Sequence, residues 1–343
     1  MAFVCGFSGA TRRMPAKIGG CRSQKTFSRD GRRSTVKMTN EFEDLAAQLA
    51  EEMGGMSPPP EIVPGVNGME YVLMNHEESG QSARVYKYGA TVQSWTQNKR
   101  EVFFTSKEAV FNGKKAIRAG IPICFPQFGP YGDLPAHGFA RITEWEVTAL
   151  EVLEDGSVYT ELKISNETES DLIKSWSGDK KWEAVYAVTL NAGGLETALR
   201  VTNNGSEPIE FTAALHNYIN CSNIEKVRMY GLDNSKYMDR LDGDKKKDEP
   251  DDMGAGVAIT EETDRIYTNI ENEVVVFDSA KLHVITIKKT PTLSDTTLWN
   301  PFGSDGCDAG WKSFVCVEPA VVSKPAVVAP GETWTGAQLF ALE

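Results

Sequence analysis

The sequence has little histidine, no long apolar run and no paired-cysteine motif. Only four histidines occur among 343 residues, so a site that uses imidazole must draw on a very small set. No apolar stretch approaches the roughly 20 residues that cross a bilayer, so we expect no membrane partner. The six cysteines form no CxxC pair and show no metal-like spacing with histidine. We therefore expect reduced, mostly buried thiols and no metal site.

Positive charge is scarce in the body of the chain. The net charge is −12, yet residues 1–40 hold nine Lys and Arg against one acid, Asp30. Residues 41–343 therefore carry 27 basic and 47 acidic residues. An acidic body of this kind repels the phosphate backbone of nucleic acid, so we expect no nucleic-acid partner.

The basic residues 1–40 are rich in Arg, Ser, Thr and Gly and lack an apolar core of the kind that directs secretion. This composition is typical of an organelle transit peptide, and its Ser, Thr and Gly favour a plastid. A basic tail retained on a cytoplasmic protein is the alternative. Residues 41–61 then combine helical apolar spacing, from Phe42 to Met53, with the prolines Pro58–Pro60, which predicts a short helix and a stiff spacer.

From residue 62 to residue 343 the pattern is that of β-strands. More than a dozen short segments are rich in β-branched and aromatic residues, mostly alternate apolar with polar positions, and are often separated by turn signals such as Asn-Gly and Asp-Gly. No amphipathic helix of ten or more residues interrupts them. The pattern predicts one all-β domain, a large antiparallel β-sandwich or barrel. We see no repeat and no second domain, and we expect a monomer.

The segment from Arg118 to Arg141, RAGIPICFPQFGPYGDLPAHGFAR, cannot form one regular element. Its prolines lack a backbone donor, and its glycines adopt backbone angles that other residues avoid. An irregular apolar segment that carries two arginines and His137 fits the wall of a small-molecule site. A turn-rich loop with its arginines in solvent is the alternative interpretation.

Two ionisable residues lie where strands should be buried. His216 lies in the apolar segment PIEFTAALHNYI, and Glu318 directly follows SFVCV. Burying an unpaired charge is costly, so both are candidates for catalysis. His216 could instead be a core imidazole that bonds to a backbone carbonyl, and Glu318 a carboxylate at the mouth of a strand, solvated or paired with a neighbouring lysine. His283 alternates with apolar residues and is expected to be structural, whereas His76, in the polar stretch NHEESG, is expected to be exposed.

Five motifs occur in one order along the chain: RAGIPICFPQFGP, HGFARITEWEV, TAALHNYI, EETDRIY and FVCVEPA. Together they resemble the hexose-6-phosphate mutarotases of the aldose-1-epimerase superfamily, over roughly residues 62–343. The resemblance implies a β-sandwich of the galactose-mutarotase type that interconverts the anomers of glucose 6-phosphate without metal or cofactor. It also implies that Glu318 is the general base at the C1 hydroxyl and His216 the general acid at the ring oxygen, each contributing about 10²–10⁴-fold. The neighbouring carboxylate would help to keep His216 protonated.

The same resemblance implies contacts to a hexose 6-phosphate substrate. Arg118 and Arg141 would bind chiefly the phosphate, because guanidinium groups form paired, charge-assisted hydrogen bonds. Asp264, in EETDRIY, would accept hydrogen bonds from sugar hydroxyls, and His137 would line the pocket. Asp239, in KYMDRL, is a second candidate for the hydroxyl contacts, although it lies beside a charged surface loop.

One position departs from the family pattern, because Ala136 stands where many relatives have glutamine. The loss of one neutral contact would cost about 1 kcal/mol and would shift affinity or sugar preference without abolishing the chemistry. Two other functions remain open: a mutarotase for other free or phosphorylated aldoses, and a sugar-phosphate-binding protein without turnover. The presence of both an acid and a base argues against the second, since binding alone needs neither.

Overall fold

β-Strands dominate the computed structural model, which describes residues 57–343 apart from 131–132, 251–252, 271–272 and 305. The leader at 1–40 and the helix predicted at 41–55 lie outside the described residues. All the named strands that pair with one another do so antiparallel, in three sheets. The predicted all-β fold is therefore confirmed.

A five-stranded sheet begins the described chain, with its strands in sequence order. Its members are β1 (Glu61–Pro64), β2 (Glu70–His76), β3 (Gln81–Tyr86), β4 (Thr91–Gln97) and β5 (Arg100–Glu101).

The end of β2 corrects one expectation from the sequence. His76 is buried, with 3% of its surface exposed, and its Nδ1 lies 2.7 Å from Ser79 Oγ. The backbone amide of Ser79 also donates to His76 Nδ1. The prediction that His76 is exposed is therefore wrong, because the polar stretch that follows β2 turns back and covers the ring.

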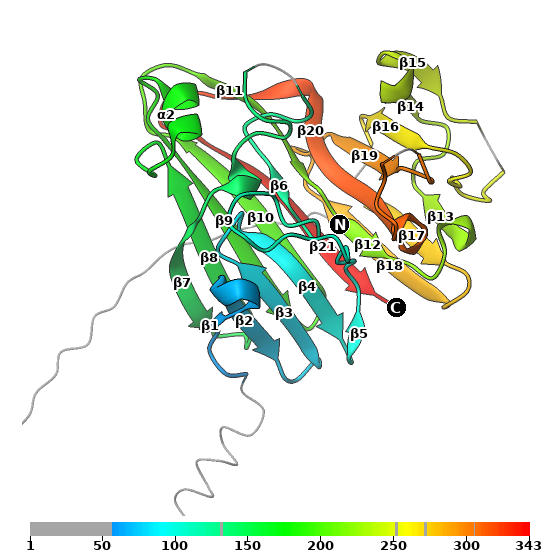
Figure 1. The fold of residues 1–343 in the computed structure, drawn as a ribbon, viewed down its shortest axis with the longest axis horizontal. Helices are drawn as coiled ribbons and strands as arrows, with labels where there is room; N and C mark the ends of the chain where they lie inside the picture. Colours follow the sequence, from blue (N-terminus) through cyan, green and yellow to red (C-terminus); the bar gives the residue numbers. More distant parts are fainter. Residues whose placement is uncertain (1–56, 131–132, 251–252, 271–272, 305) are drawn as a thin grey trace, which may run out of the picture. The chain divides into compact units, whose positions relative to one another are not determined.

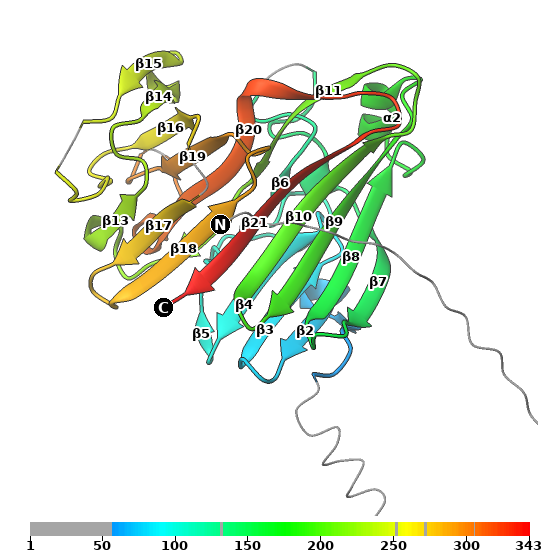
Figure 2. The same cartoon turned by 180° about the vertical axis from the view of Figure 1, so that it is seen from behind.

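An eight-stranded sheet forms the broadest layer, with the order β13-β17-β18-β21-β10-β9-β8-β7. Figure 2 shows its outer face from β7 to β13. Its members are β7 (Glu146–Val152), β8 (Val158–Ser165), β9 (Trp182–Asn191), β10 (Gly194–Asn203), β13 (Val227–Tyr230), β17 (Glu273–Asp278), β18 (His283–Lys289) and β21 (Thr333–Leu342).

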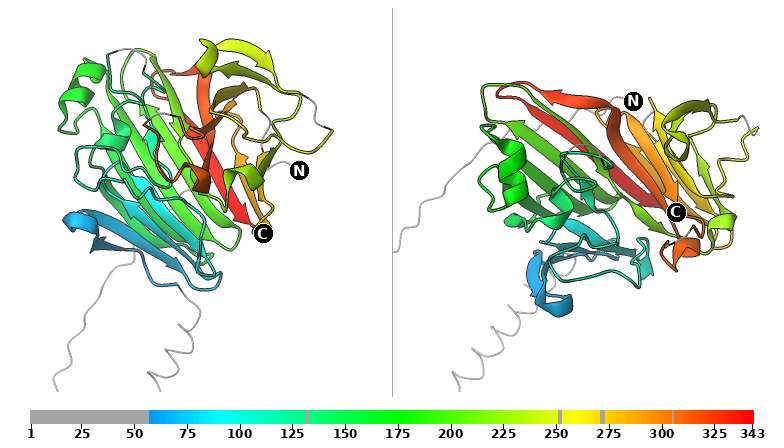
Figure 3. Two further views of the ribbon diagram at one scale, coloured as in Figure 1. Left: turned by 45° about the vertical axis from the view of Figure 1, so that its right-hand side comes forward. Right: turned by 45° about the horizontal axis from the view of Figure 1, so that its top comes forward.

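The third sheet follows the order β15-β14-β16-β19-β20-β11-β6, and β12 also pairs with β20. Its longest member, β20, runs between β19 and β11 (Figures 1 and 3). The strands are β6 (Ile123–Cys124), β11 (Ile209–Leu215), β12 (Tyr218–Asn220), β14 (Lys236–Asp239), β15 (Lys245–Asp248), β16 (Thr263–Thr268), β19 (Asp295–Asn300) and β20 (Phe314–Val328).

Helical structure is sparse in the described part of the chain, and no helix there is long and apolar enough to span a bilayer. The α-helix α2 (Asp171–Ser177) begins after Ser170, whose side chain accepts a hydrogen bond from the amide of Ile173. The remaining helical turns are short 3₁₀ helices: η1 (Val66–Gly68), η2 (Ala140–Ile142), η3 (Ile224–Lys226), η4 (Arg240–Asp242) and η5 (Trp311–Ser313).

Large aromatic side chains fill the space between the sheets. Trp95 of the five-stranded sheet lies 6.0 Å from Phe340 of β21, measured between ring centroids, and Phe103 lies 5.2 Å from the same ring. All three rings are almost fully buried. Burying an aromatic or aliphatic side chain stabilises the fold by about 1.5–3 kcal/mol, so this contact helps to hold the two sheets together.

The thiols agree with the sequence prediction for the described residues. Cys124, Cys221 and Cys316 are buried, Cys307 is partly buried, and none is paired in a disulfide.

Candidate active site

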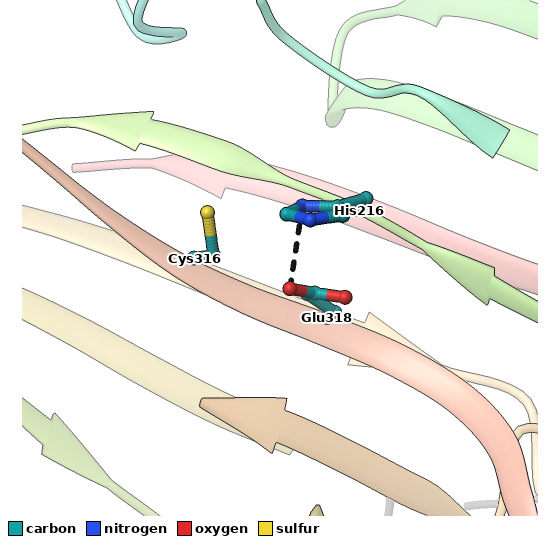
Figure 4. Close-up of side chains that lie close together, drawn as sticks. All are labelled: His216, Cys316 and Glu318. Carbon is teal, nitrogen blue, oxygen red and sulfur yellow. Dashed lines mark ion pairs between the residues drawn. The ribbon is translucent and has the colours of Figure 1, made fainter. Parts of the chain in front are cut away.

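His216 and Glu318, far apart in the sequence, lie next to each other in the third sheet. His216 Nδ1 is 3.2 Å from Glu318 Oε1. Figure 4 shows the imidazole facing the carboxylate, with the thiol of Cys316 beside them. Both groups are almost fully buried, with 6% of His216 and 1% of Glu318 exposed. The fold therefore brings together the two residues that the sequence suggested as acid and base.

The strand register explains why these two residues meet. Ala214 of β11 pairs with Ala320 of β20, and Tyr218 of β12 pairs with Cys316 of the same strand. His216 lies midway between Ala214 and Tyr218, and Glu318 lies midway between their partners on β20, so His216 falls opposite Glu318. Residues directly opposite each other in an antiparallel pair have Cβ atoms about 4.5–5.5 Å apart and project from the same face.

The same face of the sheet carries further polar and aromatic side chains. Trp299 of β19 pairs with Cys316 of β20, and Asp264 of β16 pairs with Trp299. Side chains alternate between faces along a strand, so these residues share a face with Glu318, two positions along β20 from Cys316. One wall of the site is therefore a face of this sheet.

One backbone hydrogen bond and two ring contacts hold His216 in place. Its backbone amide donates to Pro122 O at 3.0 Å. The ring stacks on Tyr218 with centroids 4.7 Å apart and planes 1° from parallel. The edge of Trp299 approaches at 5.9 Å. A catalytic group held by packing does not need to be ordered when a ligand binds.

Two atoms of this pair have no hydrogen-bond partner among the described residues. His216 Nδ1 and Glu318 Oε2 are buried and make no hydrogen bond, although Nδ1 lies 3.2 Å from the other carboxylate oxygen, Oε1. Buried polar atoms are nearly always satisfied in native structures. The two exceptions therefore mark the place where a hydroxyl-bearing ligand would find partners.

Burial disfavours charge on both members of the pair. It raises the pKa of Glu318 well above its usual value, and the nearby charge of Asp264 adds to this, while Arg141 acts in the opposite direction. Burial also lowers the pKa of His216, helped by His137 and Arg141. The sequence suggested that the carboxylate keeps His216 protonated, whereas its burial favours the neutral ring. These two shifts favour a neutral imidazole beside a protonated carboxyl group.

The segment 118–141 forms part of the site and is not a solvated loop, since most of residues 119–128 are buried. Arg118 and Arg141 lie at its two ends, and both charges act on His216. The Arg141 Nη2 group donates to Ala136 O at 2.8 Å, and 44% of the Arg118 side chain is exposed. Both predicted phosphate contacts therefore lie close to the acid–base pair, one of them at an open edge.

His137 lines the site as a neutral ring. Its centroid lies 5.6 Å from that of His216, edge to face, and its Nδ1 is 3.2 Å from Cys124 Sγ. Burial, together with Arg141 and Arg240, lowers the pKa of His137 to about 3. At neutral pH it can shape the pocket and form hydrogen bonds, but it adds no positive charge.

Gly138 explains why the motif at 137–141 has glycine at its second position. Its φ of +73° lies in the left-handed region, and a Cβ there would be 2.3 Å from Phe125 O. Only glycine fits such an approach of two backbone segments. The same approach places His137 and Arg141 beside β6.

Asp264 is paired with an arginine that the sequence analysis did not select. Asp264 Oδ1 lies 3.4 Å from the Nε of Arg240, whose guanidinium also stacks 5.5 Å above the ring of Phe128. Burial raises the pKa of Asp264 to about 6, although Arg240 opposes this. Asp239, the second candidate, accepts from the amide of Leu241 and from Lys247 Nζ, so its contacts fit a structural role.

A cavity of about 330 Å³ lies beside Asp264. Acidic side chains dominate its lining, which consists of Asp239, Leu241, Asp242, Glu261, Glu262, Thr263, Asp264 and Arg265. An anion is repelled from such a cavity and is attracted instead to Arg118 and Arg141, which do not line it.

One group of donor atoms could be compared with a metal site. His216, Cys316 and Glu318 each place a donor atom within 4.8 Å of the others. Burial raises the pKa of the Cys316 thiol well above its usual value, and Glu318 adds to this. Metal ions bind the thiolate rather than the thiol, so this donor set is a poor fit for a metal.

The comparison with known proteins agrees with this geometry. The aldose 1-epimerase family profile matches residues 70–341, so the chain belongs to the aldose 1-epimerase family. It is thus a member of a family of isomerases that act on the anomeric centre.

Among curated proteins, the chain is similar to one from Cenchrus ciliaris that is provisionally named glucose-6-phosphate 1-epimerase. The two are 35% identical, and the match covers 82% of this chain and 87% of that one. An Escherichia coli protein with the same provisional name is 31% identical, covering 75% and 84% of the two chains.

The fold is also shared with solved structures. A Salmonella typhimurium protein described as a provisional mutarotase superimposes with a TM-score of 0.69 at 22% identity, covering 86% of this chain and 99% of that one. The galactose-mutarotase type of β-sandwich, implied by the motifs, is therefore confirmed.

Proposed function

We propose that this protein interconverts the α and β anomers of a hexose 6-phosphate, with glucose 6-phosphate as its substrate. The observation that carries the proposal is the buried pair of His216 Nδ1 and Glu318 Oε1, 3.2 Å apart, with Arg118 and Arg141 close by. The provisional name of the relatives that are 35% and 31% identical supports the choice of substrate.

The reaction needs one group that takes a proton and one that gives a proton. Glu318 takes the proton of the C1 hydroxyl while His216 gives a proton to the ring oxygen. The bond from C1 to the ring oxygen then breaks and the C1 carbonyl forms. After rotation about the bond from C1 to C2, the two residues exchange roles and the ring closes as either anomer.

The buried setting affects the two halves of this cycle differently. Before ring opening the pair is imidazolium and carboxylate; after it the pair is neutral imidazole and carboxylic acid. Burial favours the second arrangement and Arg141 favours the ionised carboxylate. Burial outweighs Arg141 at Glu318, and Arg141 itself disfavours the imidazolium, so the neutral arrangement is favoured and the ionised one is the state that the catalytic cycle must populate.

The arginines distinguish a phosphorylated sugar from a free one. A phosphate carries about −1.5 to −2 charges at neutral pH and three acceptor oxygens, which match the fork of an arginine. The acidic cavity beside Asp264 disfavours the phosphate at the opposite end. We therefore place the phosphate at Arg118 and Arg141 and sugar hydroxyls at Asp264.

The direct test is exchange between the two anomers of glucose 6-phosphate, measured by saturation-transfer NMR with and without the protein. We expect exchange far above the spontaneous rate, and faster exchange for glucose 6-phosphate than for glucose, galactose or mannose 6-phosphate. A protein that leaves the spontaneous rate unchanged would contradict the proposal. Equal acceleration of free glucose would contradict the assignment of the arginines.

Replacing Arg141 with glutamine should raise the KM for glucose 6-phosphate about 10- to 150-fold, because a hydrogen bond to a charged group is worth about 1.5–3 kcal/mol. The KM for free glucose should change much less than that for glucose 6-phosphate, whereas kcat should change for both sugars, because the charge of Arg141 also acts on Glu318 and His216. Arg200→Gln is the matched control, since Arg200 pairs with Glu161 on another sheet. An unchanged KM in Arg141→Gln would remove Arg141 from the phosphate site.

The pH dependence of binding should report on Asp264. Because burial raises its pKa to about 6, the carboxylate that accepts sugar hydroxyls is lost as the pH falls through that value, and KM should rise. The substrate phosphate also titrates near pH 6. The variant Asp264→Asn separates the titration of Asp264 from that of the substrate phosphate. It should have a raised KM at neutral pH, and its KM should depend less on pH. A profile identical to that of the native protein would exclude Asp264.

A further inference from the structure

We propose that Asp308 is a positioning residue that holds the guanidinium of Arg118 at the phosphate end of the site. The proposal rests on the proposed function, since it concerns how the same site recognises its substrate. Asp308 lies outside the five sequence motifs of the site and carries out no proton transfer.

Asp308 is a buried carboxylate with a fixed orientation. Only 1% of its side chain is exposed. Its Oδ1 accepts from the amide of Gly310 at 2.7 Å, and its Oδ2 accepts from the hydroxyl of Ser106. The remaining contact is to Arg118, whose Nη1 lies 3.6 Å from the same Oδ2. A carboxylate fixed on both oxygens is a rigid anchor for a guanidinium.

The backbone of Arg118 is tied to the same place. The amide of Ser106 donates to Arg118 O at 3.0 Å, and the amide of Gly120 donates to Phe104 O at 3.0 Å. Gly120 must be glycine, because its φ is +52° and a Cβ would lie 1.8 Å from Val92 O. Both ends of Arg118, backbone and side chain, are therefore held against the segment that carries Ser106.

The anchor leaves donors for a ligand. A guanidinium has five N–H groups in a planar fork, and Asp308 faces only the Nη1 end. With 44% of its side chain exposed, an unanchored Arg118 would sample many rotamers. Holding it in one orientation before the substrate arrives removes part of the ordering cost of binding.

The anchoring of Arg118 favours phosphate binding, but the negative charge of Asp308 disfavours it, since a carboxylate repels a phosphate. Removing it would lower KM if repulsion dominated and raise KM if anchoring dominated. We expect anchoring to dominate, because Arg118 is half exposed and water weakens the longer-range repulsion more than the direct contact. The sign of the change therefore decides between the two effects.

Asp308→Asn keeps the shape and one of the two acceptor oxygens while removing the charge. The KM for glucose 6-phosphate should rise about 3- to 10-fold with kcat nearly unchanged. The kinetic constants for free glucose should not move, and inorganic phosphate should become a weaker inhibitor. A KM for glucose 6-phosphate that is unchanged or lower in an active variant would overturn the proposal.

A double-mutant cycle shows whether Asp308 acts through Arg118. In the background of Arg118→Gln, replacing Asp308 should have no further effect on KM. An equal effect in both backgrounds would mean that Asp308 supports the site in another way. Asp278→Asn is the matched control: Asp278 is buried and accepts from a serine hydroxyl and backbone amides, Ser222 and Ala280 among them, but contacts no arginine in the described structure.

A second variant covers the case in which Asp308→Asn does not fold. Ser106→Ala removes one hydrogen bond that orients Asp308, and it should raise KM in the same direction by a smaller factor. No change in KM for Ser106→Ala would then count against the proposal. Failure of the proposed function has a different signature, because the native protein itself would then not accelerate anomer exchange.

Discussion

Glu318→Gln should slow the exchange of glucose 6-phosphate anomers by about 10²–10⁴-fold. Glutamine keeps the size of the side chain but cannot take the proton of the C1 hydroxyl, so ring opening loses its base. Substrate affinity should change much less, because the arginines and Asp264 are untouched. Saturation-transfer NMR gives the exchange rate, and calorimetric titration with glucose 6-phosphate gives the affinity.

Two controls make this result specific. The circular dichroism spectrum should match that of the native protein, since glutamine has nearly the same size and shape as the glutamate that it replaces. Glu101→Gln is a control on another sheet: Glu101, on β5, is a carboxylate that accepts from a serine hydroxyl and from backbone amides. Exchange at the native rate in Glu318→Gln would refute the mechanism.

His216→Ala should reduce the exchange by a factor of the same order, about 10²–10⁴. The variant lacks the group that protonates the ring oxygen, and it also leaves space beside Tyr218. His216→Gln fills more of that space without restoring an acid of suitable pKa, so it should be nearly as slow.

The double variant tests whether the two residues act in one step. Because proton removal and proton donation occur in the same ring opening, Glu318→Gln combined with His216→Ala should be scarcely slower than the slower single variant. Multiplied losses would indicate two independent contributions. Anomer exchange at the native rate in His216→Ala would mean that His216 is not the acid, and it would contradict the proposed roles.

Much of the fold could be predicted from the sequence, because a β-strand shows itself in the pattern of neighbouring residues. Alternating apolar positions and turn residues indicate an antiparallel β-sandwich without any long-range information. Which strands pair, and in which register, cannot be read from such local patterns. That His216 falls opposite Glu318 depends on β11 and β12 keeping one register against β20.

The motifs led to six site residues, but their neighbours came from the structure. Arg240 follows Asp239 in a segment that reads as a surface loop, and only the fold shows it against Asp264 and Phe128. Asp308 and Ser106 are about two hundred positions apart and have no shared pattern. Protonation could not be predicted either, because burial of both partners decides it.

The central claim is that the C1 hydroxyl and the ring oxygen of one sugar face the adjacent side chains of Glu318 and His216, and a crystal structure of Glu318→Gln with glucose 6-phosphate tests it most directly. The account predicts the C1 hydroxyl at residue 318 and the ring oxygen at His216, each within hydrogen-bond distance of about 2.6–3.2 Å. It also predicts the phosphate at Arg118 and Arg141. A sugar bound with C1 away from both residues, or with its phosphate in the acidic cavity beside Asp264, would contradict it.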